Sequence, residues 1–328
     1  MIFDNIEKLA QISDKWVLSI GNFDGFHKGH QEIISTAIKR ARELNCKMAV
    51  ITFRPHPAAI LRPERAPELI STFELKCNNI MEFGVDAVVA IEDSYSLLNM
   101  SPEKFVDDFL TKYIQPLAIV EGENFHFGYG RSGNIATLER LGKDRGFEAI
   151  DVELKKLRFC DGVQRVSSTL VRDFLIDGRV EDACEAMGRE FRLVGEVIEG
   201  RGIGRSLGFP TANINPDGQI IPADGVYAGW VTIGEDERDA SQKSDFLPAV
   251  YSLGRAKTFV GENPLLIEAH ILSDDQKVKD GIYKKWIAMD FAAKIRPQQR
   301  FENVEKLKEQ IAKDCATAKE ILNSKHQR

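Results

Sequence analysis

Cysteine is scarce in this sequence of 328 residues, and its cysteines form no motif. The five that occur are Cys46, Cys77, Cys160, Cys184 and Cys315. Their number is odd, they lie far apart, and none belongs to a Cys-x-x-Cys pair. We therefore expect neither a disulfide framework nor a cysteine-ligated zinc site.

Long apolar runs and a positively charged leader are also missing. No apolar run approaches the roughly 18 residues that a membrane helix needs. The first segment carries Asp4 and Glu7, where a signal peptide has positive charge. These absences predict a soluble cytoplasmic protein with no membrane partner.

Basic residues do not exceed acidic residues in either half of the chain. Residues 1–187 hold 23 Lys and Arg against 29 Asp and Glu, and residues 188–328 hold 21 of each. Because broad nucleic-acid binding needs a basic surface, we expect no nucleic-acid partner. Any phosphate-binding site must then be local.

The composition is that of a globular protein with sizeable cores. Hydrophobic residues make up 43% of the chain and charged residues 29%. Since domains run to about 100–200 residues, this length predicts two of them.

The first half of the chain alternates between strand and helix patterns. Short apolar runs predict strands at Trp16–Ile20, Met48–Phe53, Val85–Ile91 and Leu117–Val120. Apolar residues at helical spacing predict helices from Ile33 to Leu44 and from Phe105 to Tyr113. This alternation is typical of α/β domains with a parallel sheet.

The second half changes period. Strands are predicted at Leu193–Ile198, Val226–Ile233, Leu247–Leu253, Leu265–Leu272 and Trp286–Ile295. Glycine and proline clusters separate them rather than amphipathic helices, which favours a small antiparallel β-barrel, and a helix from Leu307 to Leu322 follows. The change falls just after a helix that begins near Ser168, and it predicts domains 1–187 and 188–328.

The strongest local pattern lies between the first strand and the first helix. It reads Gly-Asn-Phe-Asp-Gly-Phe-His-Lys-Gly-His, from Gly21 to His30. A helix that begins there presents free backbone N–H groups and the positive end of its dipole to an anion. His27 and His30 would share one face of that helix. Two imidazoles at this place can stabilise charge that develops on an α-phosphate.

Other interpretations of this segment stay open. The histidines can be surface residues of a capped helix, or a metal pair, although no third ligand stands at a telling spacing. The segment lacks the Gly-x-x-x-x-Gly-Lys-Ser/Thr pattern and is therefore not a P-loop.

Two further segments of the first half have both a functional and a structural interpretation. Residues 167–172 open a helix, so that hydroxyls and Arg172 can bind a triphosphate, or merely cap the helix and lie on its surface. Asn124 follows a strand, where doubly wound sheets bind ligands. Phe125 and Phe127 can flank a flat ring or pack in the core.

The second half holds a glycine-rich turn and a strand with one polar face. Gly200, Gly202 and Gly204 alternate, so that their backbone N–H groups can line a phosphate. The turn does not match Gly-x-Gly-x-x-Gly and no helix pattern follows, which excludes a Rossmann dinucleotide site. Glu268 and His270 share a strand face, where Glu268 can be a general base or simply solvated.

Four segments together resemble the FMN adenylyltransferase module of bacterial bifunctional FAD synthetases. The pattern Gly-x-Phe-Asp-x-x-His-x-Gly-His is similar to the signature of nucleotidyltransferases that move AMP or CMP from a nucleoside triphosphate. The others are Thr52–Pro57 (Thr-Phe-Arg-Pro-His-Pro), Gly122–Gly128 and Ser167–Arg172. The resemblance implies a Rossmann-like nucleotidyltransferase domain.

This resemblance also implies roles for single residues. His27 and His30 would be catalytic, and Asn124, Phe125 and Phe127 would contact the flavin. ATP and its phosphates would be bound by Gly21, Phe23, Asp24, Gly25, Ser167, Ser168, Thr169 and Arg172.

Gly-Phe-Pro-Thr-Ala-Asn, residues 208–213, resembles the signature of riboflavin kinase. The resemblance continues through residues 222–229 and 267–270 to Arg296, and it implies a riboflavin kinase-like barrel.

In that barrel Thr211 and Asn213 would serve magnesium and the nucleotide phosphates, and oxygen ligands are what Mg²⁺ requires. Gly202 and Gly204 would bind ATP, and Glu268 would be the catalytic base. Four positions depart from the family pattern, namely Glu199, Ser252, Lys257 and Lys284.

The resemblance covers nearly the whole chain and implies two reactions. Riboflavin would be phosphorylated to FMN with MgATP, and FMN would then be adenylylated by a second ATP to FAD, with release of pyrophosphate. Riboflavin, FMN, FAD and ATP are thus the expected ligands. A monofunctional FMN adenylyltransferase with an impaired kinase barrel, or a non-catalytic flavin-binding regulator, are the alternatives, and the sequence predicts no oligomeric state.

Overall fold

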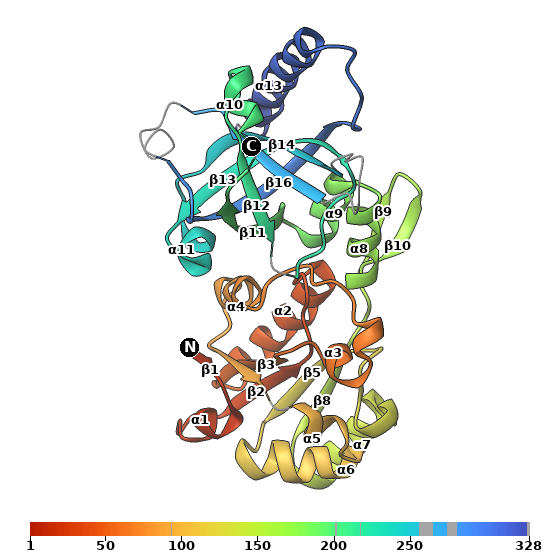
Figure 1. The fold of residues 1–328 in the computed structure, drawn as a ribbon. Coiled ribbons are helices and arrows are strands. Elements are labelled where there is room, and N and C mark those ends of the chain that lie inside the picture. The colour runs from red at the N-terminus through yellow and green to blue at the C-terminus, as the bar shows by residue number, and fades with distance from the viewer. Residues whose placement is uncertain (93, 201, 217, 256–264, 274–280, 327–328) are drawn as a thin grey trace. The chain divides into compact units, whose positions relative to one another are not determined.

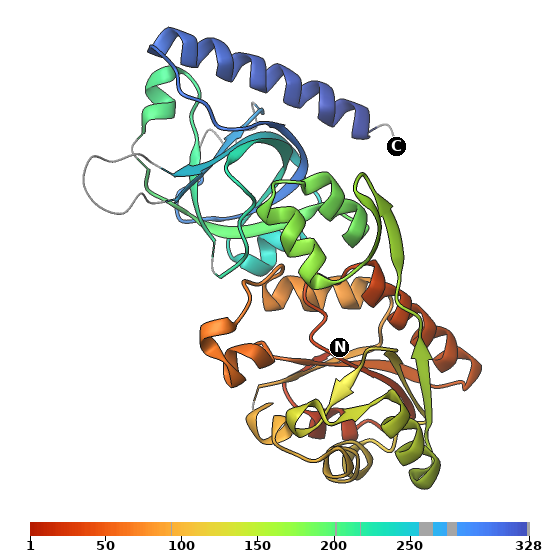
Figure 2. The same ribbon diagram turned by 90° about the vertical axis from the view of Figure 1, so that its right-hand side faces the viewer.

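The computed structural model describes residues 1–328 except 93, 201, 217, 256–264, 274–280 and 327–328. Contacts divide the chain into two compact units, which Figures 1 and 2 show from two sides. Unit 1 comprises Met1–Glu68 and Lys76–Ser167, and unit 2 comprises Leu69–Leu75 and Ser168–Arg328.

Unit 1 contains a sheet of six strands in the order β1-β4-β3-β2-β5-β8. The strands are β1 (Ile2–Phe3), β2 (Trp16–Ile20), β3 (Lys47–Phe53), β4 (Ala87–Ile91), β5 (Ala118–Gly122) and β8 (Glu148–Val152). All neighbours pair in parallel, which confirms the predicted α/β fold. β2, β4 and β5 are buried along their whole length because helices cover both faces of such sheets.

Helices connect these strands. They are α1 (Ile6–Ala10), α2 (Lys28–Glu43), α3 (Pro57–Leu61), α4 (Phe73–Glu82), α5 (Ser94–Leu98), α6 (Pro102–Lys104) and α7 (Ile135–Arg145). α2 packs on β2, β3 and β5 and buries Ile34, Ala37 and Ala41, in the predicted spacing. Within the described part of the chain, no helix is long and apolar enough to cross a membrane.

The helix predicted from Phe105 to Tyr113 has an unexpected geometry. Phe105–Thr111 is π-helical, and the Lys112 N–H bonds to the carbonyl of Asp107. Single 3₁₀ turns occur at Pro63–Arg65 and Tyr129–Arg131. Two small antiparallel pairs complete the unit, β6 (His126–Phe127) with β7 (Gly133–Asn134) and β9 (Lys156–Phe159) with β10 (Gly162–Arg165).

β2 and β5 run side by side only at their beginnings. Val17 pairs with Ala118 and Leu18 with Ile119, and no later pair joins these two strands, both of which are fully described. Beyond this point β2 stays paired with β3, and β5 with β8. Because the chain order reverses between β2 and β5, their divergence marks the topological switch point, where doubly wound sheets bind ligands.

Unit 2 contains a closed barrel in the order β11-β12-β15-β14-β13-β16, which confirms the predicted antiparallel barrel. Its strands are β11 (Phe191–Ile198), β12 (Ala212–Pro216), β13 (Gly225–Gly234), β14 (Leu247–Arg255), β15 (Leu265–Ile271) and β16 (Trp286–Arg296). β12 is absent from the sequence prediction. The long helix α13 (Val304–His326) lies along the barrel in Figure 2, with Ala318 and Leu322 packed on Val226 and Val250.

Among its described residues, unit 2 also contains four shorter helices. They are α8 (Ser168–Ile176), α9 (Val180–Met187), α10 (Ile203–Leu207) and α11 (Glu237–Gln242). α10 corrects the expectation that no helix follows the glycine-rich turn. α9 contacts β16, since Glu181 accepts the Lys294 N–H (2.9 Å) and the Cys184 thiol donates to the carbonyl of Phe291 (3.4 Å). That residue 187 divides the two activities stays a prediction.

Candidate active sites

The segment that leaves β2 is held by hydrogen bonds to β3 and the residues around it. The Gly21 N–H donates to the carbonyl of Ile51 (3.0 Å), and the Thr52 hydroxyl donates to the carbonyl of Asn22 (3.1 Å). A Cβ on Gly21 would lie only 3.1 Å from the ring of Phe23, so glycine allows the ring to approach. The predicted phosphate-binding segment therefore begins from a fixed backbone.

The next residues turn the chain through left-handed backbone. φ is 52° at Phe23, 75° at Gly25 and 35° at Phe26, and the Phe26 N–H closes the turn on the carbonyl of Phe23 (3.0 Å). Phe23 and Asp24 are each only 3% exposed. Phe23, Asp24 and Gly25 thus shape the segment from within, and their contact with ATP stays a prediction.

The two motif histidines lie together at the start of α2. His27 is the N-cap, and its Nδ1 accepts the His30 N–H (3.3 Å), so that a neutral His27 carries its proton on Nε2. The rings stack with centroids 3.6 Å apart. His27 is 5% exposed, so the interpretation of both histidines as surface residues is wrong. The arrangement puts two imidazoles at the positive end of a helix, where an anion is favoured.

Val166, the residue before the hydroxyl-rich segment 167–172, lies beside the same helix end. A Cβ on Gly29 would lie 3.3 Å from the carbonyl oxygen of Val166, and Ser167 follows directly as the last residue of unit 1. Ser168, Thr169 and Arg172 lie in the first turns of α8, which begins where the sequence predicts. Their binding of ATP stays a prediction.

The predicted flavin-binding residues follow β5. A Cβ on Gly122 would lie 3.1 Å from Oδ1 of Asn124, so the exposed Asn124 side chain lies over this glycine. The Phe125 and Phe127 rings stack 5.5 Å apart. Phe127 is 7% exposed and belongs to the core, whereas Phe125 is half-buried against it. Asn124 and Phe125 therefore retain surface for a flavin, and the core interpretation holds for Phe127.

Two buried ionisable residues at the carboxyl ends of the strands are not singled out by the sequence. Lys76 on α4 donates to the carbonyl of Phe53 at the end of β3 (3.3 Å). Burial lowers the pKa of Lys76 to about 8, against the opposing effect of Cys77 and Asp24. Glu121 on β5 is 3% exposed. In the sequence, the only feature that marks these two residues is an ionisable side chain beside apolar neighbours.

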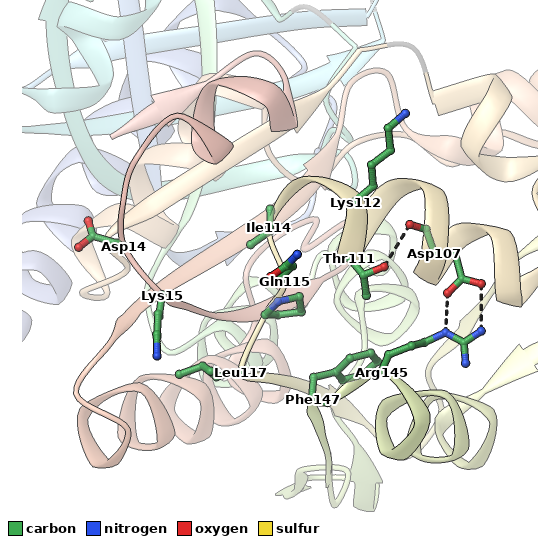
Figure 3. Close-up of a pocket in the computed structure, with 12 residues that line it drawn as sticks. Asp14, Lys15, Asp107, Thr111, Lys112, Ile114, Gln115, Leu117, Arg145 and Phe147 are labelled. Carbon is green, nitrogen blue, oxygen red and sulfur yellow. Dashed lines mark hydrogen bonds and ion pairs between the residues drawn. The ribbon is translucent and has the colours of Figure 1, made fainter.

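A cavity of about 750 Å³ in unit 1 lies away from these residues. Its lining includes Lys15, Leu117 and Phe147, which directly precede β2, β5 and β8. The cavity therefore lies at the amino ends of the parallel strands, whereas His27 lies beyond their carboxyl ends. In Figure 3, Arg145 of the cavity wall is paired with Asp107, and Lys15 and Lys112 lie apart from this pair, so the drawn cations do not converge on one ligand.

In the barrel, the three residues predicted for kinase chemistry lie together. Asn213 on β12 is paired with Glu268 on β15, and the Thr211 hydroxyl donates to Oε1 of Glu268 (3.4 Å). Ala212 and Ala269 are buried, whereas Thr211, Asn213 and Glu268 are half-buried, as the alternation of a strand requires. One strand face thus carries a hydroxyl, an amide and a carboxylate.

The glycine-rich turn covers this polar face. A Cβ on Gly200 would lie 2.7 Å from Cγ of Asn213, and one on Gly204 would lie 3.0 Å from Oγ1 of Thr211. Gly202 has φ of 69° and precedes α10. The alternating glycines therefore let the backbone approach the two predicted magnesium and phosphate ligands.

His270 extends the same strand face. Its Nδ1 lies 2.7 Å from the carbonyl of Pro210, so this nitrogen carries the proton and donates. Phe209 packs edge-on against the imidazole, with centroids 5.6 Å apart. His270 therefore fixes the backbone that leads into Thr211.

The described residues that depart from the riboflavin kinase pattern lie in different surroundings. Ser252 on β14 is paired with Glu268 and accepts a hydrogen bond from Nε2 of Gln298 (3.0 Å). Lys284 has φ of 65°, the left-handed region that favours glycine. Glu199 is exposed, and Lys257 lies outside the described residues.

The sequence matches two protein-family models in succession. FAD synthetase matches residues 9–170, and riboflavin kinase matches residues 187–322. These spans contain the histidine pair and the Thr211–Asn213–Glu268 cluster, respectively.

Curated proteins and a solved structure match along nearly the whole chain. Bifunctional riboflavin kinase/FMN adenylyltransferase of Escherichia coli K12 is 34% identical over 93% of this chain and 92% of its own. The protein of the same name from Haemophilus influenzae is 33% identical over 94% of both chains. A structure described as a macrolide-efflux protein from Streptococcus pneumoniae has a TM-score of 0.81 and 27% identity over 97% of this chain and 98% of that chain. This chain therefore belongs to the bifunctional riboflavin kinase/FMN adenylyltransferase family.

Proposed function

We propose that this protein phosphorylates riboflavin to FMN in its barrel and adenylylates FMN to FAD in its α/β unit. The observation that carries the proposal is that each family model spans its own assembled polar cluster. Riboflavin, FMN, FAD and ATP are the ligands, and we assign the reactions to the cytoplasm.

In the kinase reaction Glu268 takes the proton of the riboflavin hydroxyl, while the hydroxyl oxygen attacks the γ-phosphorus of ATP. The bond from that phosphorus to ADP breaks, so that FMN and ADP are the products. The Thr211 hydroxyl donates to Glu268, which orients the carboxylate (3.4 Å).

Oxygen donors at this place fit Mg²⁺, which neutralises charge on the phosphates of bound ATP. Thr211 and Asn213 are the residues that would hold it. Among the described residues, no group of three or more His, Cys, Asp or Glu side chains is placed to hold a metal ion. The fit therefore rests on hydroxyl and amide oxygens together with the nucleotide.

In the adenylyltransferase reaction an oxygen of the FMN phosphate attacks the α-phosphorus of ATP, and pyrophosphate leaves. No covalent enzyme intermediate is needed, so the chain must position the reactants and stabilise charge at phosphorus. His27 and His30 supply that stabilisation at the start of α2. Ser167, Ser168, Thr169 and Arg172 assist with the phosphates, and Asn124 contacts the flavin.

Separation of the two activities by substitution tests this proposal. We expect His27→Asn with His30→Asn to abolish FAD formation while FMN accumulates from riboflavin, because asparagine keeps the N-cap acceptor but removes the imidazoles. We expect Glu268→Gln to abolish FMN formation while supplied FMN is still converted to FAD. Flavins are separated by chromatography after incubation with MgATP.

Each variant is the folding control for the other activity. Absence of both products from the unsubstituted protein would contradict the whole proposal, and flavin binding without turnover would favour the regulator. FAD from supplied FMN without any FMN from riboflavin would favour the monofunctional alternative, to which Ser252 beside Glu268 draws attention.

A further inference from the structure

Glu121 is a buried carboxyl group at the divergence of β2 and β5. It is the fourth residue of β5 and only 3% exposed. One of its oxygens, Oε1, accepts the backbone N–H of Ile20 and lies 3.4 Å from the hydroxyl of Ser19. Both partners are the last residues of β2.

The position of these contacts follows from the sheet register. Pairing between β2 and β5 ends at Leu18 and Ile119, so β5 supplies no backbone acceptor to Ile20, and all these residues are described. The next N–H of the chain is that of Gly21, directly after β2, and it bonds on the other side to the carbonyl of Ile51 on β3 (3.0 Å). The Glu121 side chain therefore replaces a missing ladder partner in the interior of the sheet, where an unpaired N–H is costly.

The Glu121 side chain does not need to be ionised to accept these hydrogen bonds. Burial raises the pKa of Glu121 well above its ordinary value, and the hydrogen bonds from Ile20 and Ser19 only partly oppose this. The carbonyl oxygen of a neutral carboxyl group accepts an N–H as a carboxylate does. The neutral amide of glutamine has the same shape and the same acceptor.

The end of β2 matters because the histidine segment begins there. Ile20 is followed directly by Gly21, and six residues later His27 caps α2. We propose that Glu121 is a positioning residue for adenylyl transfer, because its side chain fixes the end of β2 from which the segment Gly21–His30 departs. This inference rests on the proposed adenylyltransferase function.

Three substitutions separate this role from a general effect on folding. Glu121→Gln keeps the acceptor at the same reach, Glu121→Asn has the same amide one methylene shorter, and Glu121→Leu has the bulk without an acceptor. We expect kcat for FAD formation from FMN to fall about tenfold for Asn and Leu, as for the loss of a buried hydrogen bond, and to stay within about twofold for Gln. FMN formation from riboflavin by the same preparations should stay within about twofold of the unsubstituted protein in all three.

The outcomes are distinct. Wild-type FAD formation by the Asn variant would overturn the proposal, and so would an equal loss in the Gln and Asn variants. If the Leu variant does not fold, the Gln and Asn pair decides alone. If the unsubstituted protein forms no FAD from FMN, the proposed function fails instead, and amide hydrogen exchange at residues 20–22 still tests whether Asn releases the end of β2.

Discussion

At the scale of single residues, the protonation of a buried polar group affects the stability of this protein, and Glu121 is the clearest case. Its ordinary pKa of 4.5 is raised in the folded protein, chiefly by burial. The native state therefore binds a proton that the unfolded state has already released above that pH. Its stability must fall as pH rises from 4.5 through the raised pKa.

We expect Glu121→Gln to remove this pH dependence. Relative to the glutamine variant, the unsubstituted protein should lose about 1.4 kcal/mol of unfolding free energy per pH unit within that window. Urea unfolding of both proteins from about pH 5 to about pH 8 measures the difference. Glu123→Gln, at an exposed carboxylate two residues further on, is the control and should follow the unsubstituted protein. A constant difference between the glutamine variant and the unsubstituted protein over this range would show that the pKa of Glu121 is not raised in the folded protein.

Residue identity also explains what the sequence can and cannot predict of the sites. The patterns identify His27, Thr211, Asn213 and Glu268, because a family motif marks each of them. They do not identify Glu121, since a strand buried on both faces shows no alternation that would mark its one carboxylate as internal. Nor do they show that His27 is a buried cap, which depends on where α2 begins.

At the scale of elements, periodicity predicts most of the fold. The central strands of both units follow apolar runs, and α2 follows its helical spacing. β12 is missed because its five residues directly follow Gly-Phe-Pro-Thr, which is typical of a turn, and its pairing with β11 and β15 depends on distant residues. The π-helical turn at 105–111 is missed because its hydrogen-bond register leaves no local signal.

The neighbouring strand β15 gives a prediction for His270. Its Nδ1 donates to the carbonyl of Pro210, two residues before β12 begins. We expect His270→Leu to lower kcat for FMN formation about threefold to tenfold, because the loss of this bond frees the backbone that leads to Thr211. Chromatography of flavins after incubation with riboflavin and MgATP measures it.

His270→Asn is the matched variant, since its amide N–H can replace the imidazole donor. It should retain activity within about twofold, as for a preserved hydrogen bond, and both variants should form FAD from supplied FMN normally. An Asn variant as slow as the Leu variant would show that the ring, and not its donor, is required.

At the scale of the whole molecule, the two clusters belong to different units and need only share FMN. We therefore expect two variant chains, each lacking one of the two activities, to complement each other when mixed. The protein with His27→Asn and His30→Asn should make FMN, and the protein with Glu268→Gln should convert it to FAD. The measurement is FAD formed from riboflavin in the mixture, which should appear after a lag as free FMN accumulates.

Each variant alone must form no FAD from riboflavin, and the second must convert supplied FMN. A mixture that fails although both conditions hold would mean that FMN made in one barrel is not released to another chain.

Under the proposed mechanism, His27 serves at one position as the N-cap of α2 and as a catalytic residue, so that stability and activity make opposing demands on it. Asparagine, aspartate and serine are preferred N-caps, so the substitutions that would strengthen this helix are those that would remove the imidazole to which we assign charge stabilisation. Replacing His27 by one of these residues would raise the free energy of unfolding by as much as about 1 kcal/mol, so selection for stability alone would favour the replacement. The weaker cap at this position would then be the cost of the catalytic role that we propose for His27.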